Sequence, residues 1–378
     1  MSGRRKFKLL IVLGTRPEAL KLAPIILEAR KNKSFMTFVC LTAQHREMVD
    51  QVLKLFRIKV DFDLNLMEKG QSLGDLTHRL FSKIQKVINR VKPDVIVIQG
   101  DTTTAFAVAL KAFYERIPVA HVEAGLRSHD KYHPFPEEAN RVLISHLADY
   151  HFAPTEEARK NLLHEGISPK KIWVTGNTVV DALELIRPSL NGRALPYLNK
   201  DSEKRKLILV TAHRRESFGK PLRSICAALR DLSAKHPDIE IVYPVHLNPQ
   251  VQRVVFKELK GKKGIRLVNP LSYEEFARLM DRAYLILTDS GGIQEEAPSF
   301  KTPVLVMRDV SERPDGLLLG VAKLVGTSRE KIVREASRLI EDPKAYAEMI
   351  KSRNPYGDGK ASGRILSALK NLSLRAVQ

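Results

Sequence analysis

The stretch GDTTTAFAVALKAFYERIPVAHVEAGLRSHDKYHPFPEEANR, residues 100–141, decides the fold. An apolar run at residues 95–98 ends directly before it, a second run lies within it at residues 118–122, and a helix-length segment separates the two. Strand, helix and strand in this order predict two parallel strands joined by a right-handed crossover. Asp101 and Glu123 follow the two runs, so both carboxylates are expected at the carboxyl ends of their strands, where open parallel sheets bind ligands.

Each of these two carboxylates also has an ordinary structural explanation. Asp101 can cap the next helix, and Glu123 can open a loop. The stretch continues, however, with further charged or titratable side chains, namely Arg127, His133, Glu137, Glu138 and Arg141. Two strand-end carboxylates followed by this group favour a functional site over capping alone.

The rest of the chain repeats the alternation of short apolar runs with amphipathic segments. In the first half, strands are expected at residues 8–13, 36–42, 95–98, 118–122, 150–153 and 172–175, and helices at 18–30, 46–56, 73–91, 103–116, 136–147 and 156–165. In the second half, strands are expected at 206–212, 239–244, 285–288 and 303–307, and helices at 222–235, 330–341 and 362–374. Regular alternation of this kind is typical of α/β proteins with parallel sheets.

The length of 378 residues predicts two domains, and a polar stretch at residues 188–205 is the best linker between them. We therefore expect an α/β fold with two Rossmann-like, doubly wound domains and an interdomain cleft. Residues 1–180 would form the N-terminal domain and 181–360 the C-terminal domain, while residues 361–378 would be a last helix that packs back on the N-terminal domain.

The composition, 43% hydrophobic and 28% charged, is typical of a globular protein. No apolar run approaches the roughly 20 residues of a membrane span. The first apolar run leads into Thr-Arg-Pro-Glu at residues 15–18 rather than into a small-residue cleavage site, so it is interpreted as a strand. Cys40 and Cys226 lie in separate apolar segments without the Cys/His spacing of a zinc site. These features predict a cytoplasmic protein without a bound metal.

The formal net charge of +20 could indicate a polyanionic partner such as nucleic acid. The basic residues are spread along the chain, and the densest cluster, at residues 257–263, has no interleaved aromatic side chains on which bases could stack. A solvated lysine-rich surface is the simpler explanation, so neither a nucleic-acid partner nor a membrane is expected.

Polar clusters follow several other predicted strands. Residues 14–18, GTRPE, follow the first strand but lack the G-x-G-x-x-G pattern, so no nicotinamide cofactor is indicated. Basic or glycine-rich turns follow three strands of the second half at residues 213–216, 289–296 and 308–313. Paired cations and the backbone N–H groups at a helix start both suit phosphate oxygens. The second domain is therefore expected to hold a diphosphate-bearing nucleotide that faces carboxylates from the first.

Ten motifs occur along the chain in this order: GTRPEALKLAP, TAQHREMVDQVL, GDTTT, HVEAGLRS, PEEANR, GNTVVDAL, HRRESFG, YPVHLNP, LTDSGGIQEEAPS and ERP. With these motifs the chain closely resembles the non-hydrolysing UDP-N-acetylglucosamine 2-epimerases over nearly its whole length. The resemblance implies two Rossmann-like domains in the GT-B arrangement, a homodimer, and no metal or cofactor. It also implies interconversion of UDP-GlcNAc and UDP-ManNAc, by elimination of UDP to 2-acetamidoglucal and re-addition of UDP, which supplies ManNAc units for surface polysaccharide.

The resemblance also implies roles for individual residues. The acid/base group would consist of Asp101, Glu123, Glu137 and His213. The diphosphate and the sugar would be held by Arg16, Lys21, Arg141, His213, Ser290, Gly291 and Arg313, and the uridine ribose by Glu296. A second UDP-GlcNAc, bound as an activator, would contact Gln44, His45, Gln71, Glu138, Arg215 and His246. Spacing alone does not identify which carboxylate removes the C2 proton, and a surface lysine is the simpler reading of Lys21.

The chain departs from the family pattern after Pro314, where Asp315 and residues 317–321, LLLGV, replace the usual Glu, small residue and Gly-Thr. A bulkier, more apolar edge of the nucleotide pocket is expected there. The alternative enzyme classes are a 2-epimerase of a related UDP-diacetamido sugar, a hydrolase that releases free ManNAc, and a GT-B glycosyltransferase. The non-enzymatic alternative is a basic nucleic-acid-binding protein.

Overall fold

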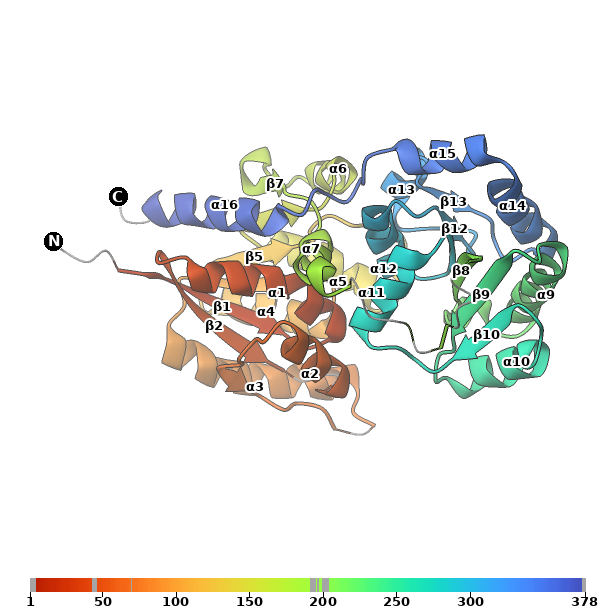
Figure 1. Ribbon diagram of the computed structural model, residues 1–378. Helices are drawn as coiled ribbons and strands as arrows, with labels where there is room; N and C mark the ends of the chain where they lie inside the picture. The colour runs from red at the N-terminus through yellow and green to blue at the C-terminus, as the bar shows by residue number, and fades with distance from the viewer. Residues whose placement is uncertain are drawn as a thin grey trace. The chain divides into compact units, whose positions relative to one another are not determined.

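The computed structural model describes residues 5–42, 46–68, 70–190, 195, 197–198 and 204–375. The chain forms two compact units (Figure 1): unit 1 comprises Met1–Leu185 together with Tyr356–Gln378, and unit 2 comprises Ile186–Pro355. The division proposed from the sequence placed the boundaries after residues 180 and 360, with a last helix that packs back on the N-terminal domain. Within the described residues, no helix has the length and apolar character needed to cross a membrane.

Unit 1 is built on a parallel sheet of seven strands in the order β3-β2-β1-β4-β5-β6-β7. The strands are β1 (Phe7–Leu13), β2 (Phe35–Leu41), β3 (Phe62–Asp63), β4 (Val95–Gln99), β5 (Val119–Val122), β6 (Tyr150–Ala153) and β7 (Ile172–Val174). The helices are α1 (Arg16–Lys31), α2 (Arg46–Leu55), α3 (Leu73–Val91), α4 (Thr103–Tyr114), α5 (Glu137–Leu147), α6 (Glu156–His164), η1 (Pro169–Lys171), α7 (Thr178–Leu190) and α16 (Ala361–Arg375).

The strand order of unit 1 reverses between β1 and β4, and this reversal marks the position along the sheet at which a ligand is expected to bind. All five residues of β4 are buried, as are the last five of β1, because helices cover both faces of the sheet. One face packs against α3, α4 and α5, and α1 lies on the other beside α16. The loops after β1, β4 and β5 therefore meet at the carboxyl edge, where doubly wound sheets bind ligands.

Unit 2 contains a second parallel sheet, of six strands in the order β10-β9-β8-β11-β12-β13. The strands are β8 (Lys206–Thr211), β9 (Ile239–Pro244), β10 (Ile265–Val268), β11 (Leu285–Thr288), β12 (Val304–Val306) and β13 (Ala322–Leu324). The helices are η2 (Arg215–Ser217), α9 (Lys220–Lys235), α10 (Pro249–Leu259), α11 (Tyr273–Arg282), α12 (Gly291–Glu296), η3 (Ala297–Phe300), α13 (Pro314–Leu318), α14 (Arg329–Glu341) and α15 (Pro343–Lys351). The order reverses between β8 and β11, so these two strands set the ligand edge here.

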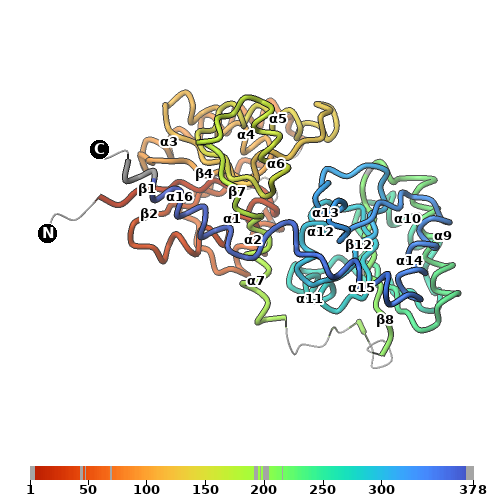
Figure 2. The backbone as a smooth tube through the Cα atoms, turned by 90° about the horizontal axis from the view of Figure 1, so that it is seen from above, coloured from red at the N-terminus to blue at the C-terminus, as the bar shows by residue number. Residues whose placement is uncertain are grey.

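The last helix, α16, belongs to unit 1 although unit 2 precedes it in the chain (Figure 2). It packs on α1, and a side chain of α7 caps its start: Asp181 accepts hydrogen bonds from the backbone N–H groups of Ala361 (3.2 Å) and Ser362 (2.7 Å). The backbone N–H of Asn177 donates to the carbonyl of Tyr356 (2.6 Å). These bonds fasten the returning chain to unit 1.

Each strand predicted from an apolar run is present, and both sheets are parallel as expected. The prediction of a linker beginning at residue 188 was wrong, because α7 continues to Leu190 with Pro188 inside it. Leu183, Ile186 and Leu190 are buried at helical spacing, and their burial keeps the last turn helical despite the missing N–H of the proline. Most of the remaining linker lies outside the described residues.

Candidate active site

The loop after β1 is fastened to the loop after β4 by a buried carboxylate that sequence reasoning did not single out. Glu18, on α1, accepts hydrogen bonds from the backbone N–H groups of Gly14 (3.0 Å) and Thr15 (2.6 Å) and from the hydroxyl of Thr102 (2.7 Å). Burial raises the pKa of Glu18, and these hydrogen bonds act in the opposite direction. Arg16, a predicted substrate ligand, is half-buried at the start of α1, on the loop that Glu18 holds.

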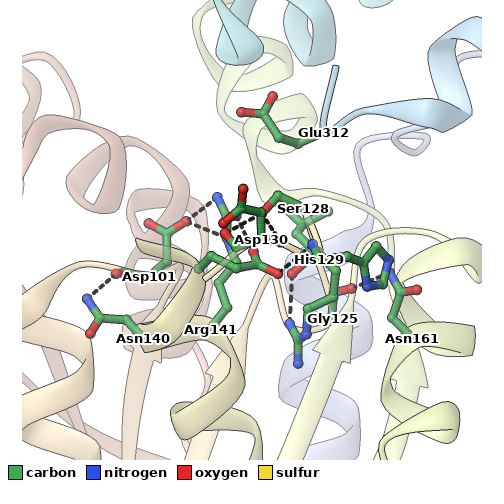
Figure 3. Close-up of polar contacts among 12 residues, drawn as sticks. Asp101, Gly125, Ser128, His129, Asp130, Asn140, Arg141, Asn161 and Glu312 are labelled. Carbon is green, nitrogen blue, oxygen red and sulfur yellow. Dashed lines mark hydrogen bonds and ion pairs between the residues drawn. The ribbon is translucent and has the colours of Figure 1, made fainter. Parts of the chain in front are cut away.

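Asp101 follows β4 and is held by a guanidinium fork (Figure 3). Its Oδ2 atom accepts from Nε (2.8 Å) and Nη2 (2.7 Å) of Arg141, and its backbone carbonyl accepts from the side-chain amide of Asn140 (2.8 Å). The alternative role of Asp101 as a helix cap is wrong, because Thr102 is the residue whose side chain accepts from the N–H of Ala105 at the start of α4. The Asp101 carboxylate is thus fixed in orientation without being used for capping.

Arg141 itself is supported by a second, more deeply buried carboxylate. Its Nη1 donates to Oε2 of Glu138 (2.8 Å), and the other oxygen of Glu138 accepts the backbone N–H of His129 (3.0 Å). Burial alone would raise the pKa of Glu138, but the hydrogen bonds from Arg141 and from the backbone outweigh it and lower the pKa. Glu138 therefore acts as an anionic support for Arg141, whatever further role it has.

Glu123 follows β5 and lies in a buried ion pair. It adopts a left-handed backbone conformation with φ of 64°, and its Oε2 atom contacts the ammonium group of Lys21 and accepts from the side-chain amide of Asn177 (3.0 Å). Both Lys21 and Glu123 are buried, so the reading of Lys21 as a surface lysine was wrong. A lysine is tolerated inside a core only beside a partner such as this carboxylate.

Glu137 begins α5 beside the Asp101 loop and is half-buried. Its Oε2 atom is buried and has no hydrogen-bond partner among the described residues. Buried polar atoms are nearly always paired, so an unpaired carboxylate oxygen marks a position that a ligand or a proton can occupy.

Two other residues of the opening stretch are not part of this group. Arg127 is buried, and all three of its guanidinium nitrogens donate: Nε and Nη2 each to a carboxylate oxygen of Glu165 (2.6 Å), Nη2 also to Ser145 (2.8 Å), and Nη1 to the carbonyl of Leu126 (2.7 Å). The exposed ring of His133 contacts Asp130 at 2.9 Å. Their positions in the sequence next to the carboxylates therefore did not indicate a shared site.

His121, on β5, contacts the loop that carries Asp101, and its pKa is strongly lowered. Its Nε2–H donates to the carbonyl of Gly100 (2.7 Å), and its Nδ1 atom has no partner among the described residues. Burial lowers the pKa of His121 to about 3. The ring is therefore neutral at neutral pH, and it anchors the turn that carries Asp101.

We expect the neutral, buried state of His121 to make unit 1 less stable in acid. An unfolded histidine binds a proton below a pH of about 6.5, whereas the native ring does so only near 3, so the free energy of unfolding falls as pH falls through this range, by at most about 1.4 kcal/mol per pH unit. Urea unfolding at about pH 7 and about pH 5, followed by fluorescence of Trp173, the single tryptophan, measures this loss.

In His121→Gln the loss between these two pH values should be smaller than in the wild type. The matched control is His164→Gln, which replaces an exposed histidine on α6 of the same unit and should leave the loss unchanged. Equal losses in the wild type and in both variants would show that His121 does not govern the acid sensitivity.

In unit 2, the loops after β8 and β11 are joined by Asp289, a second buried carboxylate that sequence reasoning did not single out. Its Oδ2 atom accepts the backbone N–H groups of His213 (2.6 Å) and Arg214 (2.8 Å). The ring of His213 stacks on that of His246, with centroids 5.1 Å apart and planes 10° apart. Burial lowers the pKa of His213; Asp289 opposes this shift, whereas His246 and Arg214 add to it.

The glycine-rich turn after β11 contacts the predicted arginine. Ser290 precedes α12, and a methyl group added at Gly291 would come within 3.1–3.3 Å of the guanidinium of Arg313. Nε of Arg313 donates to the buried Glu295 (2.9 Å). Glu296, the predicted ribose ligand, is the last residue of α12 and is buried. A side chain at position 291 would therefore require the guanidinium of Arg313 to shift by a few tenths of an ångström.

Beside Arg313, Glu312 contacts two arginines, Arg308 at 2.8 Å and Arg313 at 3.7 Å. Burial would raise its pKa, but the two guanidinium groups lower it to about 2. In the departure from the family pattern, Leu318 and Leu319 are exposed.

Of the residues predicted to bind an activator, the structure describes only some. Gln44 and His45 lie outside the described residues, as does the side chain of Arg215. The side-chain oxygen of Gln71 accepts from Arg79 (2.7 Å) and from the backbone of Glu68 (3.2 Å), so its contacts are local. His246 is exposed.

Comparison with known proteins agrees with the resemblance seen in the motifs. The pattern of the family described as UDP-N-acetylglucosamine 2-epimerase matches residues 27–370. The chain is 52% identical to the UDP-N-acetylglucosamine 2-epimerase of Escherichia coli K12 over 373 residues, covering 96% of this chain and 98% of that one. It is 54% identical to the Yersinia pestis enzyme of the same name over 371 residues, again covering 96% and 98%.

Solved structures with the same fold include enzymes with bound nucleotides. The UDP-GlcNAc 2-epimerase of Neisseria meningitidis, bound to UDP-GlcNAc, superimposes with a TM-score of 0.89 at 46% identity and covers 96% of this chain and 99% of that one. The Methanocaldococcus jannaschii enzyme, in complex with UDP-GlcNAc and UDP, gives a TM-score of 0.81 at 36% identity and covers 97% and 100%. The predicted family and the GT-B-like fold class are thus confirmed, and this chain belongs to the UDP-N-acetylglucosamine 2-epimerase family.

Proposed function

We propose that this enzyme interconverts UDP-GlcNAc and UDP-ManNAc by eliminating UDP and adding it back. The observation that carries the proposal is the pair of carboxylates, Asp101 and Glu123, that follow adjacent parallel strands and are each held by a cation. Epimerisation at C2 needs groups that remove and return a proton, and strand ends of a rigid sheet position such groups well. The relatives named above carry the same activity in their names.

The proposed reaction has two balanced halves. A base removes the C2 proton while the C1–O bond to the diphosphate breaks, which leaves 2-acetamidoglucal and UDP. A proton then adds to C2 on the opposite face while a diphosphate oxygen of UDP re-forms the bond at C1. Each half needs a proton-transfer group near C2 and positive charge or N–H donors at the diphosphate.

The proton-transfer groups would be drawn from Asp101, Glu123, Glu137 and His213. Among these, Glu137 has the unpaired buried oxygen, and Asp101 is only partly buried, with Arg141 fixing its orientation. Lys21 and Arg141 are proposed to hold the sugar or the diphosphate while they also fix the two carboxylates. These pairings support a role for both cations in placing the reacting groups.

The diphosphate would be held by a second set of groups, from the β1 loop and from unit 2. This set consists of Arg16, His213, Ser290, Gly291 and Arg313, with Glu296 on the ribose. The contact between Arg313 and Gly291 supports the proposal, because it keeps a guanidinium beside backbone N–H groups at the start of α12. In this proposal unit 1 supplies the three carboxylates of the acid/base group, and unit 2 supplies His213 and most of the groups that bind UDP.

The finer features implied by the family are proposals of the same kind. We propose a cytoplasmic homodimer that supplies ManNAc units for surface polysaccharide. A second UDP-GlcNAc would act as an activator through Gln44, His45, Gln71, Glu138, Arg215 and His246. The contact of Glu138 with Arg141, which also binds Asp101, offers a physical route by which an activator could alter the catalytic group.

The test is incubation of the enzyme with UDP-GlcNAc alone in deuterium oxide, followed by NMR. Deuterium at C2 of both recovered UDP-sugars is expected, because the C2 proton exchanges during each elimination. Unlabelled UDP-sugars after full turnover would overturn the mechanism. Free ManNAc as the product would indicate a hydrolase instead, and a strict need for an acceptor would indicate a glycosyltransferase.

A further inference from the structure

The orientation of the His213 ring is fixed by contacts with two neighbouring residues, Asp289 and His246. Its backbone N–H and that of Arg214 both donate to Oδ2 of Asp289, so one carboxylate oxygen anchors the turn after β8. The face of the ring stacks on His246 at 5.1 Å between centroids. With the backbone tied and one face covered, the ring has little freedom to turn over.

The second oxygen of Asp289 faces the same ring. Oδ1 lies 3.3 Å from Nδ1 of His213, is itself buried, and has no hydrogen-bond partner among the described residues. Asp289 is fully buried, so this oxygen is shielded from bulk solvent. A buried carboxylate oxygen beside a ring nitrogen is best satisfied when that nitrogen carries the proton.

The neutral ring of His213 carries one proton, and the nitrogen that holds it determines which nitrogen can accept a proton in the reaction. Burial lowers the pKa of His213 more than Asp289 raises it, so the ring is neutral at neutral pH. A neutral imidazole has one donor nitrogen and one acceptor nitrogen. The neighbouring His246 has its own arrangement, because its Nδ1 accepts the backbone N–H of Asn248 (3.1 Å) and its proton therefore lies on Nε2.

We propose that Asp289 is a positioning residue for His213, holding the proton of the neutral ring on Nδ1 and leaving Nε2 as the atom that accepts or returns protons in the reaction. This inference rests on the proposed function, which places His213 in the acid/base group. Asp289 does not itself contact the substrate in this scheme. It acts by choosing the tautomer, as a buried carboxylate does for the histidine of a catalytic triad.

The decisive variant is Asp289→Asn. The amide oxygen of the asparagine can still accept the two backbone N–H groups, but its NH₂ group would face Nδ1 as a donor. That nitrogen must then become an acceptor, and the ring proton moves to Nε2. The nitrogen available for proton transfer is then Nδ1 instead of Nε2, so kcat should fall by roughly 10²–10⁴-fold.

The experiment combines kinetics with nitrogen NMR of the full-length enzyme labelled with ¹⁵N-histidine. The chain has 11 histidines, and the spectrum of His213→Gln identifies the signals of His213 by their absence. We expect Nδ1–H in the wild type and Nε2–H in Asp289→Asn. The matched control is Asp231→Asn on α9, which alters an exposed ion pair with Arg329 and should change neither the tautomer nor kcat.

Each outcome decides the proposal. Nε2–H in the wild type, the same tautomer in both proteins, or an unchanged kcat in Asp289→Asn would overturn it. If Asp289→Asn does not fold, the wild-type spectrum alone still decides, because the proposal requires Nδ1–H. Failure of the proposed function is distinguishable, because it would appear as missing deuterium exchange in the wild type while the tautomer is read independently of activity.

Discussion

Asp101→Asn is expected to lower kcat by roughly 10²–10⁴-fold, the range typical of a positioned acid/base group, while UDP still binds. The asparagine keeps the size of the side chain and one oxygen for the guanidinium of Arg141, but it can neither take up nor release the proton. Initial rates of C2 epimerisation by NMR and calorimetric titration with UDP provide the two measurements. A loss confined to kcat would separate proton transfer from binding.

The matched control for this variant is Asp94→Asn, because Asp94 lies at the amino end of β4 and Asp101 follows its carboxyl end. Asp94 directly precedes β4, accepts the backbone N–H of Lys8 (2.8 Å) and pairs with Arg5. It is far along the strand from the ligand edge, so its replacement should leave kcat unchanged even if stability falls. A similar loss in both variants would indicate general damage to the sheet, and a nearly unchanged rate in Asp101→Asn would remove this residue from the reaction.

The second large effect concerns stability. Lys21→Met should lower the free energy of unfolding by about 3–5 kcal/mol, because it removes the ammonium group that pairs with the buried Glu123 carboxylate. Methionine has nearly the same shape as the lysine stem, so the loss would reflect charge rather than a cavity. Urea unfolding monitored through Trp173, which lies on β7 of the same unit, reports this change.

The double variant Lys21→Met with Glu123→Gln tests the cause of that loss. It removes both charges together, and most of the lost stability should return, although catalysis should not. If the double variant is as unstable as Lys21→Met, the lost free energy of unfolding comes from altered packing around Lys21 and not from the unpaired charge. A loss below about 1 kcal/mol in the single variant would show that the buried pair contributes as little as a surface pair.

Much of the fold could be predicted from sequence because parallel strands buried on both faces need continuous apolar runs. Residues 95–98 and 207–210 are such runs, and each became a central strand. The helices missed, such as α11 (Tyr273–Arg282) and α15 (Pro343–Lys351), are amphipathic and partly exposed, with apolar residues too few to stand out from the surrounding charges. The missed strand β10 is only half-buried, since it lies at the edge of its sheet.

The residues of the candidate site likewise fall into those that could be predicted from the sequence and those that could not. Asp101 and Glu123 could be singled out because a strand end is visible in the sequence. Glu18 was missed although Thr15 and Glu18 have the spacing of a capping box, which is visible in the sequence. Asp289 could not be singled out, because it accepts backbone N–H groups of the loop that follows another strand, β8. Such bonds depend on how loops come together at a sheet edge, which residue spacing does not encode. A carboxylate next to a glycine-containing turn after an apolar strand is the only signal that they share.

The chain leaves unit 1 after residue 185 and returns to it at residue 356, and this path has a consequence for synthesis on the ribosome. Unit 2 is one continuous segment and can close as soon as it has emerged. Unit 1 begins first but lacks α16 at that stage, so Asp181 and the face of α1 that packs on α16 gain their partners only when residues 361–375 have been made. Chains usually fold from the N-terminus as they emerge. In this protein the N-terminal unit is completed only after unit 2 has been synthesised, and a chain truncated before residue 356 would leave it without α16.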